Sequence, residues 1–398
     1  MKQEHIILRA LGRPGGAPEF LGGPGAMPSS AGAGSPKMAV EMEMLSAGGA
    51  AAAARHNDVV AVAPVMPMRL VEPLDEGLAA PTAAGPDWGV TAVGAVNSPF
   101  TGDGIVVAVL DTGIDSTHPA FAGVNLVTKS FTGSADASDD HGHGTHCAGT
   151  IFGRDVDGVR IGVARGVKKA LIGKVLGPGG GGSDQIVKAI QWAVGEGANV
   201  ISMSLGMDFP GFQKQLMNNA GMPQEVATSR ALEGYRMNVL LFERLAAMVL
   251  ALSDFMQTTL LIAAAGNESR TNVNPDFKIA VAPPAVSEGM ISVAALGQSP
   301  GGLTPASFSN TGALVSGPGV AITSAKRGGG LVSMSGTSMA TPAVAGVAAL
   351  WAQKLKALGP LNTKVLTARL VASGTLAPLK PGFDPGDVGS GLVQAPQN

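Results

Sequence analysis

Three side chains of the types that cooperate in nucleophilic catalysis follow separate apolar or glycine-rich runs of this chain. Asp111 comes directly after the apolar run GIVVAVL, His143 opens the stretch HGTHCAGT, and Ser338 lies within SMSGTSMATP. A serine hydroxyl is a weak nucleophile until an imidazole takes its proton, and that imidazole needs a carboxylate to fix its tautomer and stabilise its charged form. The three residues therefore predict a nucleophilic hydrolase.

Asn267 adds an amide to this set, because it follows another apolar run, TLLIAAAG. A tetrahedral intermediate carries an oxyanion that hydrogen-bond donors must stabilise. The side-chain amide of Asn267 and the backbone N–H of Ser338, at the start of a helix, are of the right kind. We therefore expect these two groups to form an oxyanion hole.

The stretch HGHGTHCAGT (141–150) suggests a second interpretation, because it holds three of the six histidines and the single cysteine. A metal-binding protein that uses His141, His143 and His146 is the alternative. Two zinc-binding histidines on one helix are usually four residues apart, whereas His143 and His146 are three apart. No Glu or further ligand stands at the required spacing, which weakens the metal interpretation.

The segments that carry these residues have the pattern of a parallel sheet. Five short, nearly continuous apolar runs are typical of strands buried on both faces: 104–110, 170–176, 199–205, 259–266 and 290–296. Between two of them, Ser183 as an N-cap and apolar residues at helical spacing predict a helix that ends near Gly195. Alternating strands and helices predict an α/β domain with its chemistry at the carboxyl ends of the strands.

The first 75 residues have a different organisation. Short strands are predicted at 5–11 and 38–44, a helix at 47–55, and one or two further strands at 59–71. We therefore expect a small α+β unit over residues 1–75, with a Gly/Pro-rich loop at 11–36 and a linker at 76–87. The main domain would cover 88–398.

Composition narrows the classes of function. The 398 residues are 45% hydrophobic and 14% charged, which is enough to bury a large core. A net charge of −2 gives no basic surface for nucleic acid, and no run approaches the roughly 18 apolar residues of a membrane helix. Neither nucleic acid nor a membrane is therefore expected as a partner. The single cysteine excludes an internal disulfide and leaves the compartment open.

Four motifs give the chain a family resemblance: VAVLDTGID (107–115), HGTHCAGT (143–150), AAAGNE (263–268) and GTSMATP (336–342). In the order Asp, His, Asn, Ser they resemble the subtilisin-like serine proteases, also called subtilases or the S8 peptidase family. Within that family, the motifs are most similar to those of the proteinase K branch. The resemblance extends over about 88–398 through pieces such as SFSN (307–310).

This resemblance implies a three-layer α/β/α fold with a mainly parallel sheet, and a serine endopeptidase that works through an acyl-enzyme. Asp111, His143 and Ser338 would be its triad, and Asn267 would complete its oxyanion hole. His146 would be a buried structural residue, and Cys147 a free cysteine and not a nucleophile. A catalytically silent subtilase fold that only binds other molecules is a further alternative.

The family also binds its substrate as an added β-strand. The corresponding segments here contain Gly179, Gly180, Gly181 and Gly182 on one side, and Ser204, Leu205 and Gly206 on the other. Unit 1–75 resembles the propeptide of a zymogen, which would pack on the main domain and leave its C-terminal end in the substrate cleft. A permanent accessory domain is the alternative. As a propeptide it would be removed by self-cleavage between about Leu74 and Asp87.

Several features lie outside the family pattern. Segment 207–236 looks inserted. Asp155 and Asp157 in RDVDG are weak candidates for a structural calcium site, since calcium prefers six to eight oxygens. Catalysis should need no cofactor.

The expected partners are protein or peptide substrates and the chain's own N-terminal unit, and the expected state is a monomer. The family is mainly secreted, yet this N-terminus has no recognisable export signal, so cytoplasmic location and non-classical export both stay open.

Overall fold

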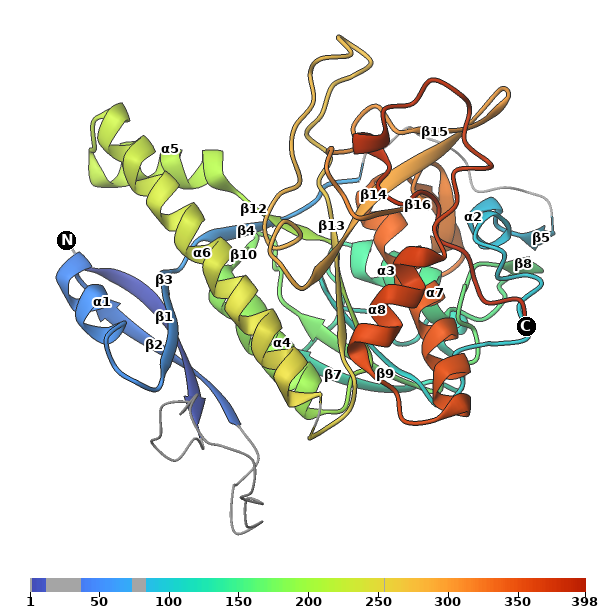
Figure 1. Ribbon diagram of the computed structural model, residues 1–398, viewed down its shortest axis with the longest axis horizontal. Coiled ribbons are helices and arrows are strands. Elements are labelled where there is room, and N and C mark those ends of the chain that lie inside the picture. Colours follow the sequence, from blue (N-terminus) through green and yellow to red (C-terminus); the bar gives the residue numbers. More distant parts are fainter. Residues whose placement is uncertain (1, 12–36, 74–83, 254) are drawn as a thin grey trace, which may run out of the picture.

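The central feature of the computed structural model, which describes residues 2–11, 37–73, 84–253 and 255–398, is an eight-stranded sheet (Figure 1). Its order is β15-β14-β13-β11-β6-β9-β7, and β16 also pairs with β14. Every pairing is parallel except that of β15 with β14. The strands are β6 (Val106–Asp111), β7 (Asn125–Ser130), β9 (Lys169–Lys174), β11 (Val200–Met203), β13 (Leu260–Ala264), β14 (Met290–Ser299), β15 (Gly302–Pro305) and β16 (Val315–Pro318).

Both faces of this sheet are covered, which explains the continuous apolar runs. In β6, Val107 and Val109 belong to one hydrophobic cluster, whereas Ala108 and Leu110 belong to a second one on the opposite face. The first cluster includes residues of α2 (Trp88–Ala92), α3 (His143–Phe152), α7 (Thr337–Leu358) and α8 (Thr363–Ala372). The second includes residues of α4 (Ser183–Gly195) and α6 (Gln224–Leu252). The predicted three-layer α/β/α fold with a mainly parallel sheet is confirmed.

The N-terminal unit is a small sheet with one helix. Its strand β1 (Gln3–Leu11) lies antiparallel between β2 (Lys37–Leu45) and β3 (Val59–Pro64), and α1 (Ala47–Ala53) covers one face. The other face, with Ile6 and Leu8, joins the hydrophobic cluster of α4 and α6. This unit therefore lies against the helical layer of the main domain (Figure 1). Predicted loop 11–36 lies outside the described residues apart from residue 11, as does linker 76–87 apart from residues 84–87.

Strand β4 (Pro67–Leu70) does not join the small sheet of its own unit, which consists of β2, β1 and β3. It lies antiparallel between two short strands of the main domain, β10 (Gly181–Gly182) and β12 (Leu205–Met207). Ser183 extends this pairing, since its N–H donates to the carbonyl of Met66 and its Oγ accepts from the N–H of Met66. Helix α4 begins at Ser183, so its N-cap is Gly182 and not Ser183 as predicted.

The segment expected as an insertion at 207–236 forms a helical hairpin. Helix α5 (Phe209–Ala220) ends at Gly221, whose φ of 62° suits glycine, and α6 then runs without interruption for 29 residues. The apolar segment 237–252 is the second half of this helix. In the part of the chain that the structure describes, every helix is too short or too polar to cross a membrane.

The remaining elements are short connections around the main sheet. They are β5 (Gly85–Pro86), β8 (Val159–Arg160), β17 (Ile322–Ala325), β18 (Leu331–Met334) and two 3-10 turns, η1 (Pro119–Phe121) and η2 (Pro385–Asp387). Strand β5 pairs with β8, and β17 pairs with β18.

Candidate active site

Asp111 and His143 form a buried pair at the carboxyl end of the sheet. Asp111 is the last residue of β6 and His143 the first of α3. Their Oδ1 and Nδ1 atoms are 2.8 Å apart, with side chains 1% and 0% exposed. Gly144 permits this approach, because a Cβ there would collide with the carbonyl oxygen of Gly113. The start of α3 and the turn after β6 therefore meet backbone to backbone.

Asp139 fixes this junction from the side. One of its carboxylate oxygens accepts from the Thr112 hydroxyl and the Gly142 N–H, both at 2.8 Å, and the other accepts from the N–H and hydroxyl of Thr145. Burial alone would raise the pKa of Asp139, but the hydrogen bonds from Thr145, Gly142 and Thr112 outweigh it and lower that pKa. An ionised Asp139 thus ties the turn after β6 to α3.

The imidazole of His143 has the electrostatic setting of a general base. Burial opposes its charged form, but the Asp111 carboxylate outweighs this effect and holds the pKa of His143 well above its usual range. Nδ1 is engaged by Asp111, while the buried Nε2 has no hydrogen-bond partner among the described residues. Above that pKa, Nε2 is free to take a proton, and Asp111 stabilises the imidazolium that results.

Ser338 is the second residue of α7, and the structure places it beside α3. The Sγ of Cys147, one turn along α3 from His143, lies 3.4 Å from the Ser338 carbonyl oxygen, to which Ser204 Oγ also donates at 3.1 Å. The Ser338 hydroxyl donates to the carbonyl of Val71 at 2.9 Å. It is therefore directed at a backbone carbonyl of the N-terminal unit.

Cys147 lacks the features of a nucleophile. Burial raises the pKa of its thiol, so the thiolate is disfavoured. Its sulfur packs between the two helices that carry His143 and Ser338. The residue therefore has a packing role in this structure.

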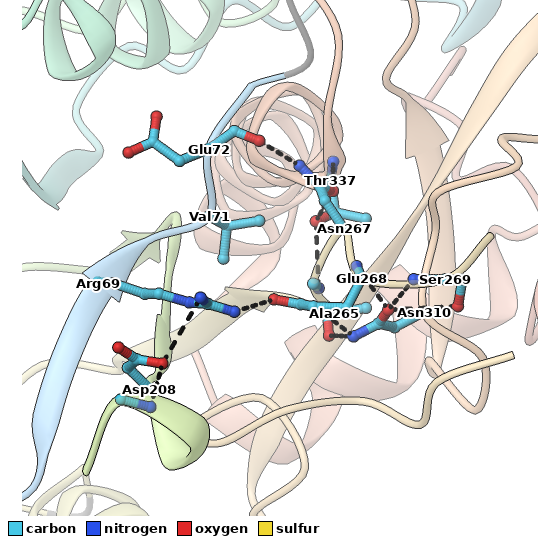
Figure 2. A network of polar contacts seen from close by, with 12 residues as sticks. Arg69, Val71, Glu72, Asp208, Ala265, Asn267, Glu268, Ser269, Asn310 and Thr337 are labelled. Carbon is cyan, nitrogen blue, oxygen red and sulfur yellow. Dashed lines mark hydrogen bonds and ion pairs between the residues drawn. The ribbon is translucent and has the colours of Figure 1, made fainter. Parts of the chain in front are cut away.

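Asn267 is oriented by α7 (Figure 2). Its Oδ1 accepts from both the N–H and the hydroxyl of Thr337 at 2.9 Å, so that its Nδ2 points into the cleft and donates to the Glu72 carbonyl at 2.9 Å. Asn310 stabilises the backbone that follows Asn267, since its Oδ1 accepts from the N–H groups of Glu268 and Ser269. Sequence reasoning assigned Asn310 no role, although it lies in the SFSN piece of the resemblance.

Most of the expected substrate-binding residues line β4. In the strand register, Leu205 is opposite Leu70, Gly206 opposite Arg69, and Gly181 opposite Met68. Gly182 pairs with Pro67, and a Cβ on Gly180 would lie 2.6 Å from the Met68 carbonyl oxygen.

Two residues of that set are placed differently. Gly179 does not pair with β4 but lines a cavity of about 410 Å³ that also contains Arg69, Leu70 and Glu72. Ser204 donates its hydroxyl to α7, as described above, and so helps to position Ser338.

The three histidines of the metal interpretation do not converge. His146 Nε2 lies 2.9 Å from the carbonyl of Ile322, and His141 has a 45% exposed side chain near Glu72. Among the described residues, the one group of three potential ligands consists of Asp111, His143 and Cys147. A metal site built on His141, His143 and His146 is therefore wrong.

The calcium candidates do not form a ligand set either. Asp155 faces the guanidinium of Arg165 at 3.3 Å, and Asp157 lies in a turn with a φ of 50°. Within the described ranges, no third acidic side chain joins them in a potential metal group. A calcium ion needs many oxygen ligands, so a structural calcium at Asp155 and Asp157 stays a prediction.

Comparison with known proteins identifies the family. Residues 102–379 match the model of the Subtilase family. The chain belongs to the subtilase family. M-protease of Shouchella clausii is 34% identical over 276 residues, which are 67% of this subtilase and 60% of that relative.

Two further relatives have similar identity. Pen ch 13, a subtilisin-like serine protease of Penicillium rubens, is 33% identical over 72% of this subtilase and 63% of its own length. Subtilisin Savinase of Lederbergia lenta is 34% identical over 67% of this chain and 84% of its own. The chain thus spans less than two thirds of the first two relatives. These comparisons do not distinguish the proteinase K branch, which stays a prediction.

The buried His146 predicts a pH dependence of stability. Burial lowers the pKa of its imidazole to about 3, against about 6.5 in the unfolded chain. Between these values the unfolded state binds more protons, so the stability from a neutral His146 is complete above pH 6.5 and is lost as the pH falls toward 3. The loss has a limiting slope of about 1.4 kcal/mol per pH unit.

Denaturant unfolding of the Ser338→Ala chain with and without His146→Gln, from pH 7 to pH 4, measures this effect. Gln keeps an N–H donor for the Ile322 carbonyl but does not titrate, so the variant should lose less stability on acidification. His56→Gln, at an exposed position, is the control. Equal pH slopes with and without His146→Gln would contradict the prediction.

Proposed function

We propose that this subtilase is a serine endopeptidase, made as a zymogen that cleaves itself. The observation that carries the proposal is the position of β4. This strand lies in the cleft as a peptide substrate would, and the carbonyl oxygen of Val71 accepts a hydrogen bond from Ser338 Oγ at 2.9 Å. A backbone carbonyl of the chain is thus already within reach of the nucleophile.

The reaction uses three side chains. Ser338 Oγ attacks the carbonyl carbon while Nε2 of His143 takes the hydroxyl proton, and Asp111 holds Nδ1–H and stabilises the imidazolium. The C–N bond then breaks, and His143 gives its proton to the leaving amine. A water molecule next attacks the acyl ester with His143 again as the base, which releases the carboxylate and restores Ser338.

Asn267 and the backbone N–H of Ser338 supply the charge stabilisation. Thr337 fixes the Asn267 amide, whose Nδ2 donates here to the carbonyl of Glu72. For cleavage after Val71, the Val71 carbonyl must take that place on Nδ2 before the oxyanion forms. Fixed donors need no reorganisation as the oxyanion forms, and removal of one such donor typically lowers turnover about 10²–10³-fold.

The bond between Val71 and Glu72 is our candidate for self-cleavage. Val71 is 4% exposed, and its Cγ2 would touch a Cβ on Gly206 at 3.5 Å, so its side chain occupies an apolar part of the cleft. The sequence placed the cleavage between about Leu74 and Asp87, and residues 74–83 of that interval lie outside the described residues. The contact of Ser338 with Val71 favours the earlier bond.

A fluorophosphonate probe tests the nucleophile, since it labels a serine that an adjacent base activates. The self-processed parent should be labelled, Ser338→Ala should not, and Asp111→Asn should be labelled about 10⁴-fold more slowly. Ser335→Ala, which removes the hydroxyl three residues before Ser338, is the control. Label that survives Ser338→Ala but disappears in Ser335→Ala would contradict the assignment. A parent that does not process itself, and that stays unlabelled after an added protease has removed unit 1–75, would favour a silent subtilase fold.

Mass spectrometry and N-terminal sequencing test the processing. The active parent should begin at Glu72, whereas Ser338→Ala should keep the full mass of 39.7 kDa. Val71→Asp should slow the cleavage at least about tenfold, because a charged carboxylate would enter an apolar part of the cleft, while Val71→Ala should process readily. An N-terminus within 74–87 would contradict the Val71–Glu72 bond, and an active chain with Met1 intact would contradict the zymogen.

A further inference from the structure

We propose that Asp208 and Glu268 form a subsite for a cationic side chain, arginine or lysine, at the third residue before the cleaved bond. We call these two residues the acidic pair. The inference rests on the proposed function, since it concerns which peptides the same cleft prefers.

The acidic pair already holds an arginine of the chain itself (Figure 2). Arg69 Nη2 lies 3.0 Å from Glu268 Oε1, and Arg69 Nη1 lies 3.5 Å from Asp208 Oδ1. The neighbours of Arg69 in β4, Met68 and Leu70, are buried, whereas the Arg69 side chain is 45% exposed. Arg69 therefore points out of the cleft into a position where two carboxylates meet it.

Backbone pairing fixes the place of this residue relative to the reacting bond. Arg69 is opposite Gly206, and the chain reaches the Ser338 hydroxyl two residues later, at Val71. A peptide that adds to the same strands in the same register brings its third residue before the bond to the acidic pair, because strand pairing sets the side-chain positions.

Both carboxylates are held in place by groups other than Arg69. Asp208 is the N-cap of α5 and accepts from the Gly211 N–H at 3.0 Å. Glu268 Oε2 accepts from Nδ2 of the fully buried Asn310 at 2.8 Å. The subsite should therefore persist when another peptide replaces β4.

Among the described residues, Arg69 is the one cationic side chain that forms an ion pair with Glu268. The nearest cationic side chain in sequence, Arg270, donates instead to the carbonyls of Asn267 and Ser269 at 2.9 and 2.7 Å. The helical hairpin of α5 and α6 contributes to this subsite, because Asp208 is the N-cap of α5.

Three peptide p-nitroanilides test the subsite: Met-Arg-Leu-Val, Met-Gln-Leu-Val and Met-Glu-Leu-Val, each with a blocked N-terminus. For the processed parent we expect kcat/KM to be about three- to tenfold higher for Arg than for Gln, and lowest for Glu, since each partly exposed ion pair contributes modestly. Added salt should reduce the Arg-to-Gln ratio, because partly exposed charges are screened.

The double variant Asp208→Asn, Glu268→Gln should bring that ratio close to one. Asn still caps α5, and Gln still offers an oxygen to Asn310, so both substitutions keep the neutral hydrogen bonds. Asp155→Asn, which breaks an ion pair of Arg165 elsewhere on the surface, is the matched control and should keep the ratio of the parent. The rate of fluorophosphonate labelling checks that each variant is folded.

The outcomes separate the two proposals. An enzyme that is labelled and cleaves all three peptides at equal rates contradicts the subsite alone, as does a parent ratio that salt and the double variant leave unchanged. A chain that is neither labelled at Ser338 nor active on any peptide contradicts the proposed function and the subsite with it.

Discussion

The antiparallel pairing of β4 with β10 and β12 is the interaction on which the arrangement of the cleft depends. Short strands with unpaired edges take up a further strand readily, because their N–H and C=O groups need partners. Here the partner comes from the N-terminal part of the same chain. This one register places Val71 at Ser338, Glu72 at Asn267 and Arg69 at Asp208 and Glu268. The proposals on processing and on substrate preference both follow from it.

The groups that we propose to react, His143 and Ser338, are held in place because the start of each helix that carries them makes several contacts. Asp139 and the close approach of Gly144 to Gly113 position His143, while Ser204, Cys147 and the Thr337–Asn267 contacts position the first turn of α7. The hydrogen bonds to Asp139 and Asn267 are buried, where a lost partner costs about 1–3 kcal/mol. The geometry of the site is thus supported by the core of the domain.

Much of this could be predicted from the sequence, because the signals are local. Runs such as 104–110 are apolar at every position since β6 is covered on both faces, and the motifs around Asp111, His143, Asn267 and Ser338 lie where strands end or helices begin. The resemblance to a propeptide implies that the C-terminal end of unit 1–75 lies in the cleft, but the strand register of β4 could not be predicted from the residues. Its pairing joins residues more than a hundred positions apart and uses backbone groups, which leave no pattern of side chains. The continuity of α6 across 236 and 237 was also missed, because its first half is more polar and resembles a separate insertion.

Hydrogen exchange of the full-length Ser338→Ala chain, followed by mass spectrometry, shows whether β4 pairs in the cleft, since this variant should keep its own N-terminal unit. If β4 occupies the cleft, the amides of residues 68–70 should exchange as slowly as those of β12, because both belong to one paired sheet. Exchange of residues 68–70 at the rate of an unpaired peptide, beside a protected β12, would contradict the account.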